Sequence, residues 1–280
     1  MAKIKRPVLR YHGGKFLLAP WIISHFPPHK VYTEAFGGAA SVLMQKNRSM
    51  AEIYNDRWDT VVNVFRILRD PVLSIRLREL IQLTPYARNE FLACDEIEIT
   101  EEEDPLEKAR KTILRSFAGF GSASTNADHA TGFRCKSRNT FTTPAADWTS
   151  YPRNIAIFTE RLQGVTIENK DYREILAQHD APHCLHYIDP PYVHSTRNFK
   201  RGNANYCHEF SNEDHIQLAE IVRKLTGSVI ISGYDCPLYH DLFDDWVISR
   251  KATMADGATS RIECLWINQA AAAKLNKKLF

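Results

Sequence analysis

Five short runs rich in β-branched and aromatic residues recur along the chain, and sequence typical of a helix follows each of them. The runs are VYTEAF (31–36), AEIYND (51–56), GVTIEN (164–169), HCLHYI (183–188) and GSVIIS (227–232). Strands that alternate with helices build parallel sheets, because a parallel connection has to cross over the sheet. The sequence therefore predicts an α/β fold with a doubly wound, mostly parallel sheet.

Two later β-rich runs break this alternation. DWVISR (245–250) and ECLWIN (263–268) are separated by a turn region that contains glycine and has no helical pattern. Strands joined without a crossover pair in antiparallel fashion. We expect an antiparallel C-terminal hairpin at the end of a mixed sheet.

The strand–helix rhythm also stops between about residues 70 and 150, where two helical stretches precede a polar segment rich in Gly, Ser, Thr and Asn. We predict an inserted, mainly helical second domain at 70–149, with the main domain formed by 1–69 and 150–280. Residues 105–145 carry seven cations against Glu107 and Asp128. The cations could face phosphates or form a solvated helix surface, and the sequence leaves both open. They are Lys108, Arg110, Lys111, Arg115, Arg134, Lys136 and Arg138.

Composition restricts the class of protein. The chain has 280 residues, 44% of them hydrophobic, which is enough for one core of ordinary size. No apolar run approaches the ~20 residues of a membrane span, and the start of the chain lacks a secretory signal, so we expect a cytoplasmic protein without a membrane partner. Six cysteines without close spacing predict reduced, buried thiols, and neither they nor the histidines show the spacing of a metal site.

Polar and glycine-rich sequence follows the predicted strands where ligands bind in a doubly wound sheet, at the carboxyl ends. EAFGGAAS (34–41) follows the first strand and is expected to open a helix, so Gly37 and Gly38 would allow close backbone approach to a ligand. The glycine pair does not match the dinucleotide pattern G-x-G-x-x-G. A simple tight turn is the alternative.

Two acidic residues follow the second and third strands. Asp56 lies about twenty residues after the glycines, where a carboxylate can accept hydrogen bonds from ribose hydroxyls. Asp171 and Tyr172 could contact the edge and face of an adenine ring. Either acid could instead cap the helix that follows it.

The fourth strand ends in Asp189, Pro190, Pro191 and Tyr192. Two prolines fix φ and remove N–H donors, so this corner is rigid and presents acceptors. The Asp189 carboxylate and the Pro190 carbonyl could each accept a hydrogen from an exocyclic amino group, while Tyr192 stacks on the ring that carries it. The corner therefore suits a planar amino-heterocycle, although Asp-Pro-Pro also forms ordinary turns.

Together these segments resemble the Dam-type DNA adenine-amino methyltransferases over nearly the whole chain and in the family's order. RYHGGK (10–15) resembles the N-terminal cofactor motif, EAFGGAAS the Gly-rich loop, and IDPPY the catalytic motif. The resemblance implies a Rossmann-like methyltransferase sheet, S-adenosylmethionine as cofactor, no metal, and transfer of methyl to the N6 amino group of adenine flipped out of duplex DNA. It also implies site residues. Catalytic roles fall on Asp189, Pro190, Pro191 and Tyr192, and cofactor contacts on Tyr11, Gly14, Lys15, Phe36, Gly37, Asp56, Asp171, Tyr172 and Asp189.

The predicted insertion departs from the family's pattern. GATC-methylating relatives carry Arg-Tyr-Asn followed by Phe-Asn-x-Pro-x-Gly, whereas this chain has FRCKSRNTFTTP (133–144). The resemblance therefore does not extend to a GATC target. We expect a target-recognition role for the insertion. We also expect a protein that is a monomer in solution and could form a dimer on DNA. The predicted DNA contacts are Arg115, Arg134, Lys136, Arg138, Arg197 and Lys200.

Other substrates stay open on sequence grounds. Cytosine in DNA or adenine in RNA could take the place of adenine in DNA, and an inactive DNA-binding relative is a further alternative. Asp189 favours adenine, because cytosine-directed relatives usually have Ser or Thr at that position. Intact Lys15, Asp189 and Tyr192 favour an active enzyme.

Overall fold

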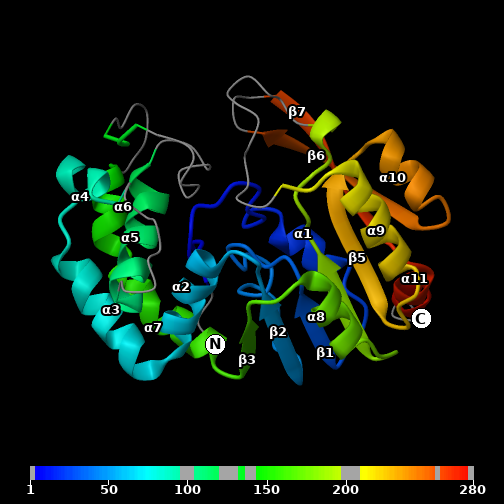
Figure 1. The fold of residues 1–280 in the computed structure, drawn as a ribbon, viewed down its shortest axis with the longest axis horizontal. Coiled ribbons are helices and arrows are strands. Elements are labelled where there is room, and N and C mark those ends of the chain that lie inside the picture. Colours follow the sequence, from blue (N-terminus) through cyan, green and yellow to red (C-terminus); the bar gives the residue numbers. More distant parts are fainter. Residues whose placement is uncertain are drawn as a thin grey trace.

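A computed structural model describes residues 4–94, 104–119, 132–135, 143–196, 209–255 and 259–276. Its centre is a seven-stranded sheet in the order β3-β2-β1-β4-β5-β7-β6 (Figure 1). All pairs formed among β1 to β5 are parallel, and β7 is antiparallel to both β5 and β6. The predicted mixed α/β sheet with its C-terminal hairpin is confirmed. The strands are β1 (Val31–Glu34), β2 (Ala51–Asn55), β3 (Val165–Glu168), β4 (Cys184–Ile188), β5 (Ser228–Tyr234), β6 (Val247–Ala255) and β7 (Thr259–Ile267).

The strand order reverses between β1 and β4. From β1 the chain moves outward to β2 and β3 and then returns to β4, which pairs with β1 through Val31 and Cys184. The connections after β1 and β4 therefore leave the sheet in opposite directions and open a crevice at the strands' carboxyl ends. The predicted Gly-rich loop and the Asp189 corner flank this crevice.

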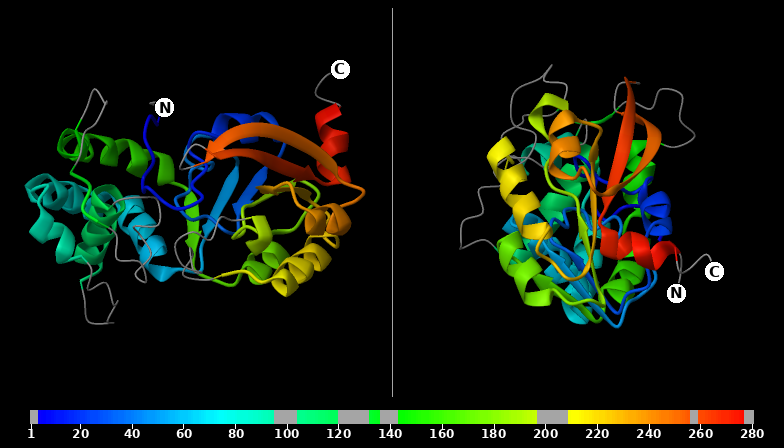
Figure 2. Two further views of the ribbon diagram at one scale, coloured as in Figure 1. Left: turned by 90° about the horizontal axis from the view of Figure 1, so that it is seen from above. Right: turned by 90° about the vertical axis from the view of Figure 1, so that its right-hand side faces the viewer.

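Helices cover both faces of the sheet, as the right-hand view of Figure 2 shows. Val229 and Ile231 of β5 belong to a buried cluster with α8, α9 and α10, whereas Ile230 belongs to the cluster that includes α1 and α11. Successive side chains of a strand point to opposite faces, so a run that is apolar throughout fits a strand buried on both sides. These helices are α1 (Ala19–Ser24), α8 (Tyr172–His179), α9 (Asn212–Val222), α10 (Pro237–Leu242) and α11 (Gln269–Asn276), and a 3-10 turn spans His194–Thr196.

The remaining helices extend the molecule beyond the β3 edge of the sheet (Figure 1). We call α3 to α6 the helical group. α2 and α7 connect it to the sheet, because α2 packs on α5 and α7 packs on α3. Phe65, Ile113 and Phe158 share one buried cluster with Tyr54 of β2, so the core is continuous from the sheet into these helices. They are α2 (Asp59–Arg69), α3 (Pro71–Leu83), α4 (Arg88–Leu92), α5 (Pro105–Ala118), α6 (Pro144–Ser150) and α7 (Pro152–Leu162).

Several of the group's cations lie inside it. Lys108 and Arg110 are each 8% exposed, and Arg115 is 2% exposed. The Arg110 guanidinium contacts Glu107 and Glu90, and Nη1 of Arg115 donates to the Cys94 carbonyl at 3.1 Å. The predicted phosphate contact of Arg115 is therefore wrong, because its buried guanidinium is used within the helical group. The solvated-surface interpretation fails for the same three residues.

The chain's N-terminal segment is clamped to the helical group. Arg10 forms a 2.8 Å ion pair with Asp147 of α6, and Arg6 donates to Ser150 at 2.9 Å. The Arg6 guanidinium also lies 4.7 Å from the centre of the Phe117 ring, within the range of a cation–π contact. This segment leads directly into Tyr11 to Lys15, so the helical group holds one end of that loop.

Two composition-based expectations can be compared with the described residues. In that part of the chain, no helix is both long enough and apolar enough to cross a bilayer. Cys94, Cys184, Cys236 and Cys264 are free and buried. Cys135 is free and exposed, so its predicted burial is wrong. Cys207 lies outside the described residues.

Candidate active site

A pocket of about 1140 Å³, a volume that includes its opening to solvent, lies at the carboxyl ends of β1, β2 and β4. Six segments line it: the loop before α1, the Gly-rich loop after β1, the end of β2, the start of α8, the Asp189 corner after β4, and the residues around the start of α9. Nine of the predicted site residues are among its lining. They are Tyr11, Gly14, Lys15, Phe36, Gly37, Asp56, Tyr172, Asp189 and Pro191.

The Gly-rich loop needs glycine for steric reasons. A Cβ on Gly37 would lie 2.3 Å from Cε2 of Tyr54, a distance that real side chains do not adopt. Gly38 has a φ of 46°, in the left-handed region that favours glycine, and the Tyr11 ring packs against it. The backbone can therefore approach a ligand closely here.

The helix expected after these glycines is absent, and residues 39–46 form turns instead. Ala40 has a φ of 52°, which interrupts a right-handed helical path. The side chain of Glu34 supplies the missing acceptor, because its Oε1 receives the Leu43 N–H at 2.6 Å. The pocket therefore has a carboxyl-capped turn where the sequence predicted a helix start.

Asp56 ties the glycine loop to the start of α2. Its two carboxylate oxygens accept the backbone N–H groups of Gly38 and Trp58, each at 2.8 Å. The N-cap of α2 is Trp58, so the alternative prediction of Asp56 as the helix cap is wrong. An acceptor held in place by two N–H groups at a pocket wall is suited to ligand hydroxyls.

Asp171 and Tyr172 have separated roles. Asp171 caps α8 by accepting the Arg173 N–H at 2.9 Å and does not line the pocket, which agrees with the cap alternative. Tyr172 does line the pocket, with its ring 4.9 Å from Phe36. Phe210, which precedes α9, packs edge-on against Phe36 at 5.6 Å. These three rings give one end of the pocket an aromatic wall.

At the Asp189 corner, Oδ1 of the acid is held from two sides. The Lys15 ammonium lies 2.9 Å away, and the Ser232 hydroxyl of β5 donates at 2.7 Å. Because Ser232 has one hydrogen, the Tyr187 hydroxyl donates to Ser232, 3.0 Å away. Both contacts of Asp189 go to Oδ1, so among the described residues Oδ2 has no competing donor.

Pro190 and Tyr192 do not line the pocket. Tyr192 is 8% exposed, and its hydroxyl donates to Glu263 of β7. The Lys15 ammonium lies 4.5 Å from the centre of the Tyr192 ring, within cation–π range. Lys15 thus touches both the acid and the aromatic ring of this corner.

Two carboxyls near the pocket have perturbed acidity. Burial raises the pKa of Glu34 to about 7, against hydrogen bonds from Tyr32 and Leu43 that lower it. Burial also raises the pKa of Glu263 to about 7, and the positive charge of Lys15 opposes that shift. Clusters of perturbed acids are typical of functional sites.

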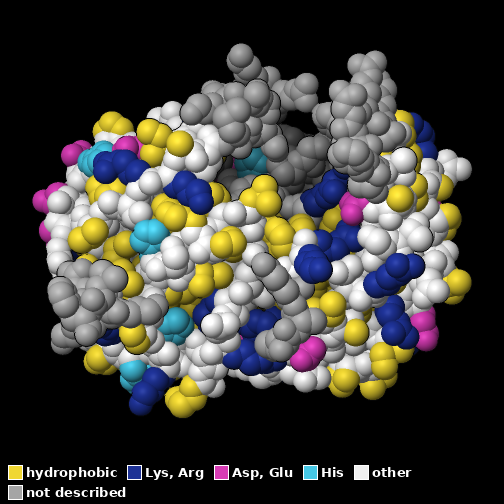
Figure 3. All heavy atoms as spheres, turned by 180° about the vertical axis from the view of Figure 1, so that it is seen from behind, with side chains coloured by type: hydrophobic (Ala, Val, Ile, Leu, Met, Phe, Trp, Pro, Cys, Tyr) yellow, Lys and Arg dark blue, Asp and Glu magenta, His cyan; other side chains and the backbone are white. Residues whose placement is uncertain are grey.

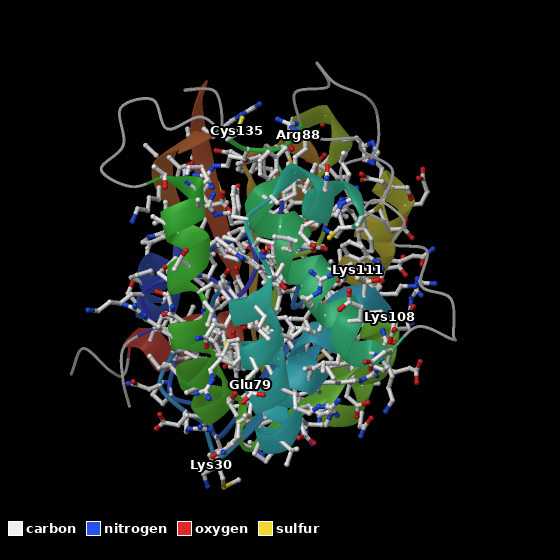
Figure 4. All side chains as sticks on the ribbon, turned by 90° about the vertical axis from the view of Figure 1, so that its left-hand side faces the viewer. Lys30, Glu79, Arg88, Lys108, Lys111 and Cys135 are labelled. Atoms are coloured by element: carbon white, nitrogen blue, oxygen red, sulfur yellow. The ribbon has the colours of Figure 1, made fainter. Side chains whose placement is uncertain are left out.

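Most of the predicted DNA contacts cannot be placed, because Lys136, Arg138, Arg197 and Lys200 lie outside the described residues. Arg134 is half-buried, and its backbone carbonyl accepts the Tyr86 hydroxyl. Arg88 is exposed beside the same segment, with its guanidinium 5.0 Å from the centre of the Phe133 ring. Figure 4 shows Arg88 and Cys135 at one end of the helical group, away from Lys108 and Lys111.

Figure 3 shows the molecule from behind. On this side, Lys and Arg side chains are more frequent over the half that contains the helical group. Among the described residues, no cluster of His, Cys, Asp and Glu could hold a metal ion. The candidate site is therefore built from hydrogen-bonding groups, aromatic rings and one ion pair.

Sequence reasoning gave no role to Glu34, Phe210, Ser232 or Glu263. Glu34 carries a usable signal, since it is an acid at the end of a buried strand directly before the glycines. Ser232 and Glu263 meet the Asp189 corner only through pairing of β4, β5 and β7, across 43 and 71 residues of sequence. No local pattern reports such contacts.

The fold and the corner define an amino-group methyltransferase, and comparisons with known proteins specify the family. Residues 11–256 match the family model described as "D12 class N6 adenine-specific DNA methyltransferase", so the chain belongs to that family. It is 25% identical over 258 residues to a DNA adenine methylase of Salmonella typhi, covering 86% of this chain and 85% of the relative.

Two further relatives cover similar lengths. The DNA adenine methylase of Escherichia coli (strain K12) is 25% identical over 261 residues, which are 86% of this chain and 85% of the relative. That of Serratia marcescens is 25% identical over 277 residues, which are 92% and 96% of the two chains. The suspected family is thereby confirmed over most of the chain.

The family uses S-adenosylmethionine as methyl donor, and the pocket fits this cofactor. Gly37 leaves space that a Cβ would fill, Asp56 offers a fixed carboxylate, and Phe36 and Tyr172 offer ring faces. A nucleoside needs acceptors for its ribose hydroxyls and flat apolar surface for its base. The residues present supply both.

Proposed function

We propose that this protein transfers a methyl group from S-adenosylmethionine to the N6 amino group of adenine in duplex DNA, after the target nucleotide is flipped out of the helix. The observation that carries the proposal is the state of Asp189. Lys15 and Ser232 fix one of its oxygens, and the other is available at the edge of a pocket that suits the cofactor. Membership of the D12 family supports the substrate.

The chain's own groups act mainly by positioning. Bound S-adenosylmethionine supplies an electrophilic methyl carbon on a sulfonium. Asp189 Oδ2 and the Pro190 carbonyl accept the two amino hydrogens of adenine, which favours the pyramidal form in which the nitrogen lone pair can attack. S-adenosylmethionine, held by Asp56, Phe36 and Tyr172, would supply the methyl carbon and would keep the electron pair of its carbon–sulfur bond on sulfur. In-line transfer of this kind depends on alignment and exclusion of water.

Asp189 acts as an acceptor first and need not remove the proton before transfer. The amino nitrogen becomes acidic only when it carries the methyl group, and its proton leaves afterwards. Lys15 lowers the cost of a partly buried carboxylate by pairing with it at 2.9 Å. Ser232 fixes the rotation of the carboxylate by donating to the same oxygen.

Cofactor contacts are proposed for the pocket's other walls. Asp56 would accept the ribose hydroxyls, and the Phe36 and Tyr172 rings would contact the adenine of the cofactor. Tyr11 and Gly14 precede Lys15 in the loop that closes the pocket, and Gly37 permits close backbone approach. For Asp171 we propose an indirect role, because it caps the helix that begins with Tyr172.

Flipping the nucleotide costs a few kcal/mol, and stacking on Tyr192 can return roughly 1–3 kcal/mol. The rest would come from phosphate contacts of residues 70–149, which we propose as the target-recognition domain, and from the segment after the Asp189 corner. Arg134, Lys136, Arg138, Arg197 and Lys200 are the candidates for these contacts. We further propose that the protein is cytoplasmic and a monomer in solution, and sedimentation with and without DNA tests whether it forms a dimer on DNA.

The direct test is to incubate the protein with tritiated S-adenosylmethionine and unmethylated DNA, and to identify the methylated nucleoside by mass spectrometry. N6-methyladenine is the expected product. N4-methylcytosine, label in RNA only, or no label would contradict the proposal. Sequencing genomic DNA from cells that express the protein, with a method that reads methylated adenine, then gives the target sequence.

Salt dependence tests the DNA surface. Replacing Arg134, Lys136 and Arg138 together should flatten the slope of log affinity against log salt by up to about 2.7, since each lost phosphate contact contributes about 0.9. Arg115→Leu is the matched control, because its side chain is buried: it should lower stability and leave the slope unchanged. Equal slopes for the triple variant and the wild type would place the phosphate contacts elsewhere.

A further inference from the structure

A buried acid of the C-terminal hairpin contacts the Asp189 corner. Glu263 of β7 is 3% exposed and accepts a hydrogen bond from the Tyr192 hydroxyl. It is placed there by the antiparallel pairing of β7 with β5, in which Glu263 lies opposite Tyr234. Glu263 does not line the pocket, so its contact with a substrate would be indirect.

The Tyr192 ring is contacted on three sides. Its hydroxyl is held by Glu263, the Lys15 ammonium lies 4.5 Å from the ring centre, and the Tyr234 ring meets it edge-on at 4.8 Å and 80°. The two prolines fix the backbone of the corner but leave the side-chain torsions of Tyr192 free. These three contacts restrict the orientation of the ring.

An acid at this position is costly unless it has a use. Burying a carboxyl disfavours its charged form, and its pKa is raised to about 7 here. An apolar residue of similar size would fill the same space without that penalty. What the carboxyl adds is an acceptor for the Tyr192 hydroxyl, together with a negative charge near Lys15 when it is ionised.

We propose that Glu263 is a positioning residue for methyl transfer, which holds the Tyr192 ring beside Lys15 and Asp189 in the orientation that receives the flipped adenine. The inference rests on the proposed function and adds a role for the C-terminal hairpin. Glu263 holds the Tyr192 hydroxyl, and Lys15, which pairs with Asp189, lies over the Tyr192 ring, so the two residues contact different parts of the same side chain.

The test compares Glu263→Met, which removes the acceptor at similar volume, with Glu263→Gln, which keeps one. Tyr192→Phe and the Tyr192→Phe/Glu263→Met double variant complete a cycle. Each protein is measured for kcat and KM on DNA, for cofactor affinity by calorimetry, and for the fluorescence of 2-aminopurine placed at the adenine that sequencing identifies. Tyr239→Phe is the control, because it removes a buried hydroxyl, bonded to His215, on the far side of β5.

Glu263→Met and Tyr192→Phe should each lower kcat by roughly tenfold, the effect of one hydrogen bond to a charged group, and should reduce the fluorescence change. Cofactor affinity should stay within about twofold, Glu263→Gln should recover most of the rate, and the double variant should be no slower than either single one. Tyr239→Phe should behave as the wild type in all three measurements.

If the wild-type protein methylates DNA and Glu263→Met keeps the same kcat and the same fluorescence change, the role of Glu263 is overturned and the proposed function stands. The same conclusion follows if the two single effects multiply in the double variant, or if Tyr239→Phe loses as much as Glu263→Met. A wild-type protein that methylates no DNA contradicts the proposed function and the role of Glu263 with it.

Discussion

The Asp189 corner and the helical group differ in how their charged side chains are paired. At the corner, Lys15 pairs with Asp189 and acts on Glu263, while Glu34 lines the same pocket, and the last two acids have a pKa raised to about 7. In the helical group, Arg110 is surrounded by Glu107 and Glu90, and Arg115 is used by a backbone carbonyl. Charges that are satisfied locally stabilise a fold, whereas partly satisfied ones remain available for a ligand.

The largest expected effect in this comparison is that of Asp189→Ala, which should lower kcat by about a thousandfold or more, since it removes the acceptor that holds the amino group. Cofactor affinity, measured by calorimetry, should be partly retained. The matched change in the helical group is Asp104→Ala, which removes the cap of α5 and should cost about 1 kcal/mol of stability without lowering kcat. Undiminished activity in Asp189→Ala would contradict the assigned role.

The second effect is a pH dependence of stability at Glu34. Its folded-state pKa of about 7 lies above its ordinary value of 4.5, so the folded state holds a proton that the unfolded state releases between these two pH values. The stability that this proton contributes is therefore present below pH 4.5 and lost as the pH rises through 7. Relative to the wild type, Glu34→Gln should gain on the order of 3 kcal/mol between pH 4.5 and pH 8.

Urea unfolding of both proteins across this pH range measures the difference. Because other titrating groups are common to both proteins, they cancel in the comparison. A stability difference that stays constant with pH would show that Glu34 is not the buried neutral acid that its surroundings indicate.

A third comparison uses two glycines. Gly37→Ala places a methyl group 2.3 Å from the Tyr54 ring and should cost about 1–3 kcal/mol and weaken cofactor binding. Gly132→Ala, beside the helical group, meets nothing within 4 Å and should leave stability and activity unchanged within about 0.5 kcal/mol. Thermal unfolding measures the stability of both variants, and calorimetry measures their cofactor affinity. Equal losses of stability and affinity in the two variants would contradict the steric argument.

The smallest expected effect is that of Asp56→Ala, which should weaken cofactor binding by roughly tenfold through lost ribose hydrogen bonds. Its counterpart is Asp70→Ala, which removes an acceptor for two backbone N–H groups at the start of α3. That change should cost about 1 kcal/mol of stability and leave cofactor affinity unchanged. Calorimetry that finds equal affinity in Asp56→Ala and the wild type would refute the ribose contact.

Local patterns predicted the sheet well, because alternation of strands and helices constrains topology strongly. All five parallel strands lie within the predicted runs to within two residues. The C-terminal hairpin pairs as expected, but β6 and β7 extend several residues beyond the runs that predicted them. The helix predicted after the glycines is absent because the side chain of Glu34, nine residues before Leu43, accepts the Leu43 N–H. Backbone competition of this kind is not visible in periodicity.

The number of Lys and Arg residues in 105–145 did not predict which of them are exposed. Lys108 and Arg115 are seven residues apart, which puts them on one stripe of α5 together with Thr112, and all three are buried. Helical spacing could have indicated that this stripe faces inward. The partners of Asp189 and Tyr192, in contrast, come from β5 and β7, and only the pairing of those strands brings Ser232 and Glu263 to the corner.

The clamp between Arg6, Arg10 and α6 limits which helical segments can be exchanged in a chain of this kind. A helical segment exchanged from a relative would have to bring its own acceptors for these two guanidinium groups and a hydroxyl to replace that of Tyr151, which bonds the Val8 carbonyl. Without them, the loop that presents Lys15 would lose its anchor. Grafts of a foreign helical segment should therefore include the first ten residues of the donor protein.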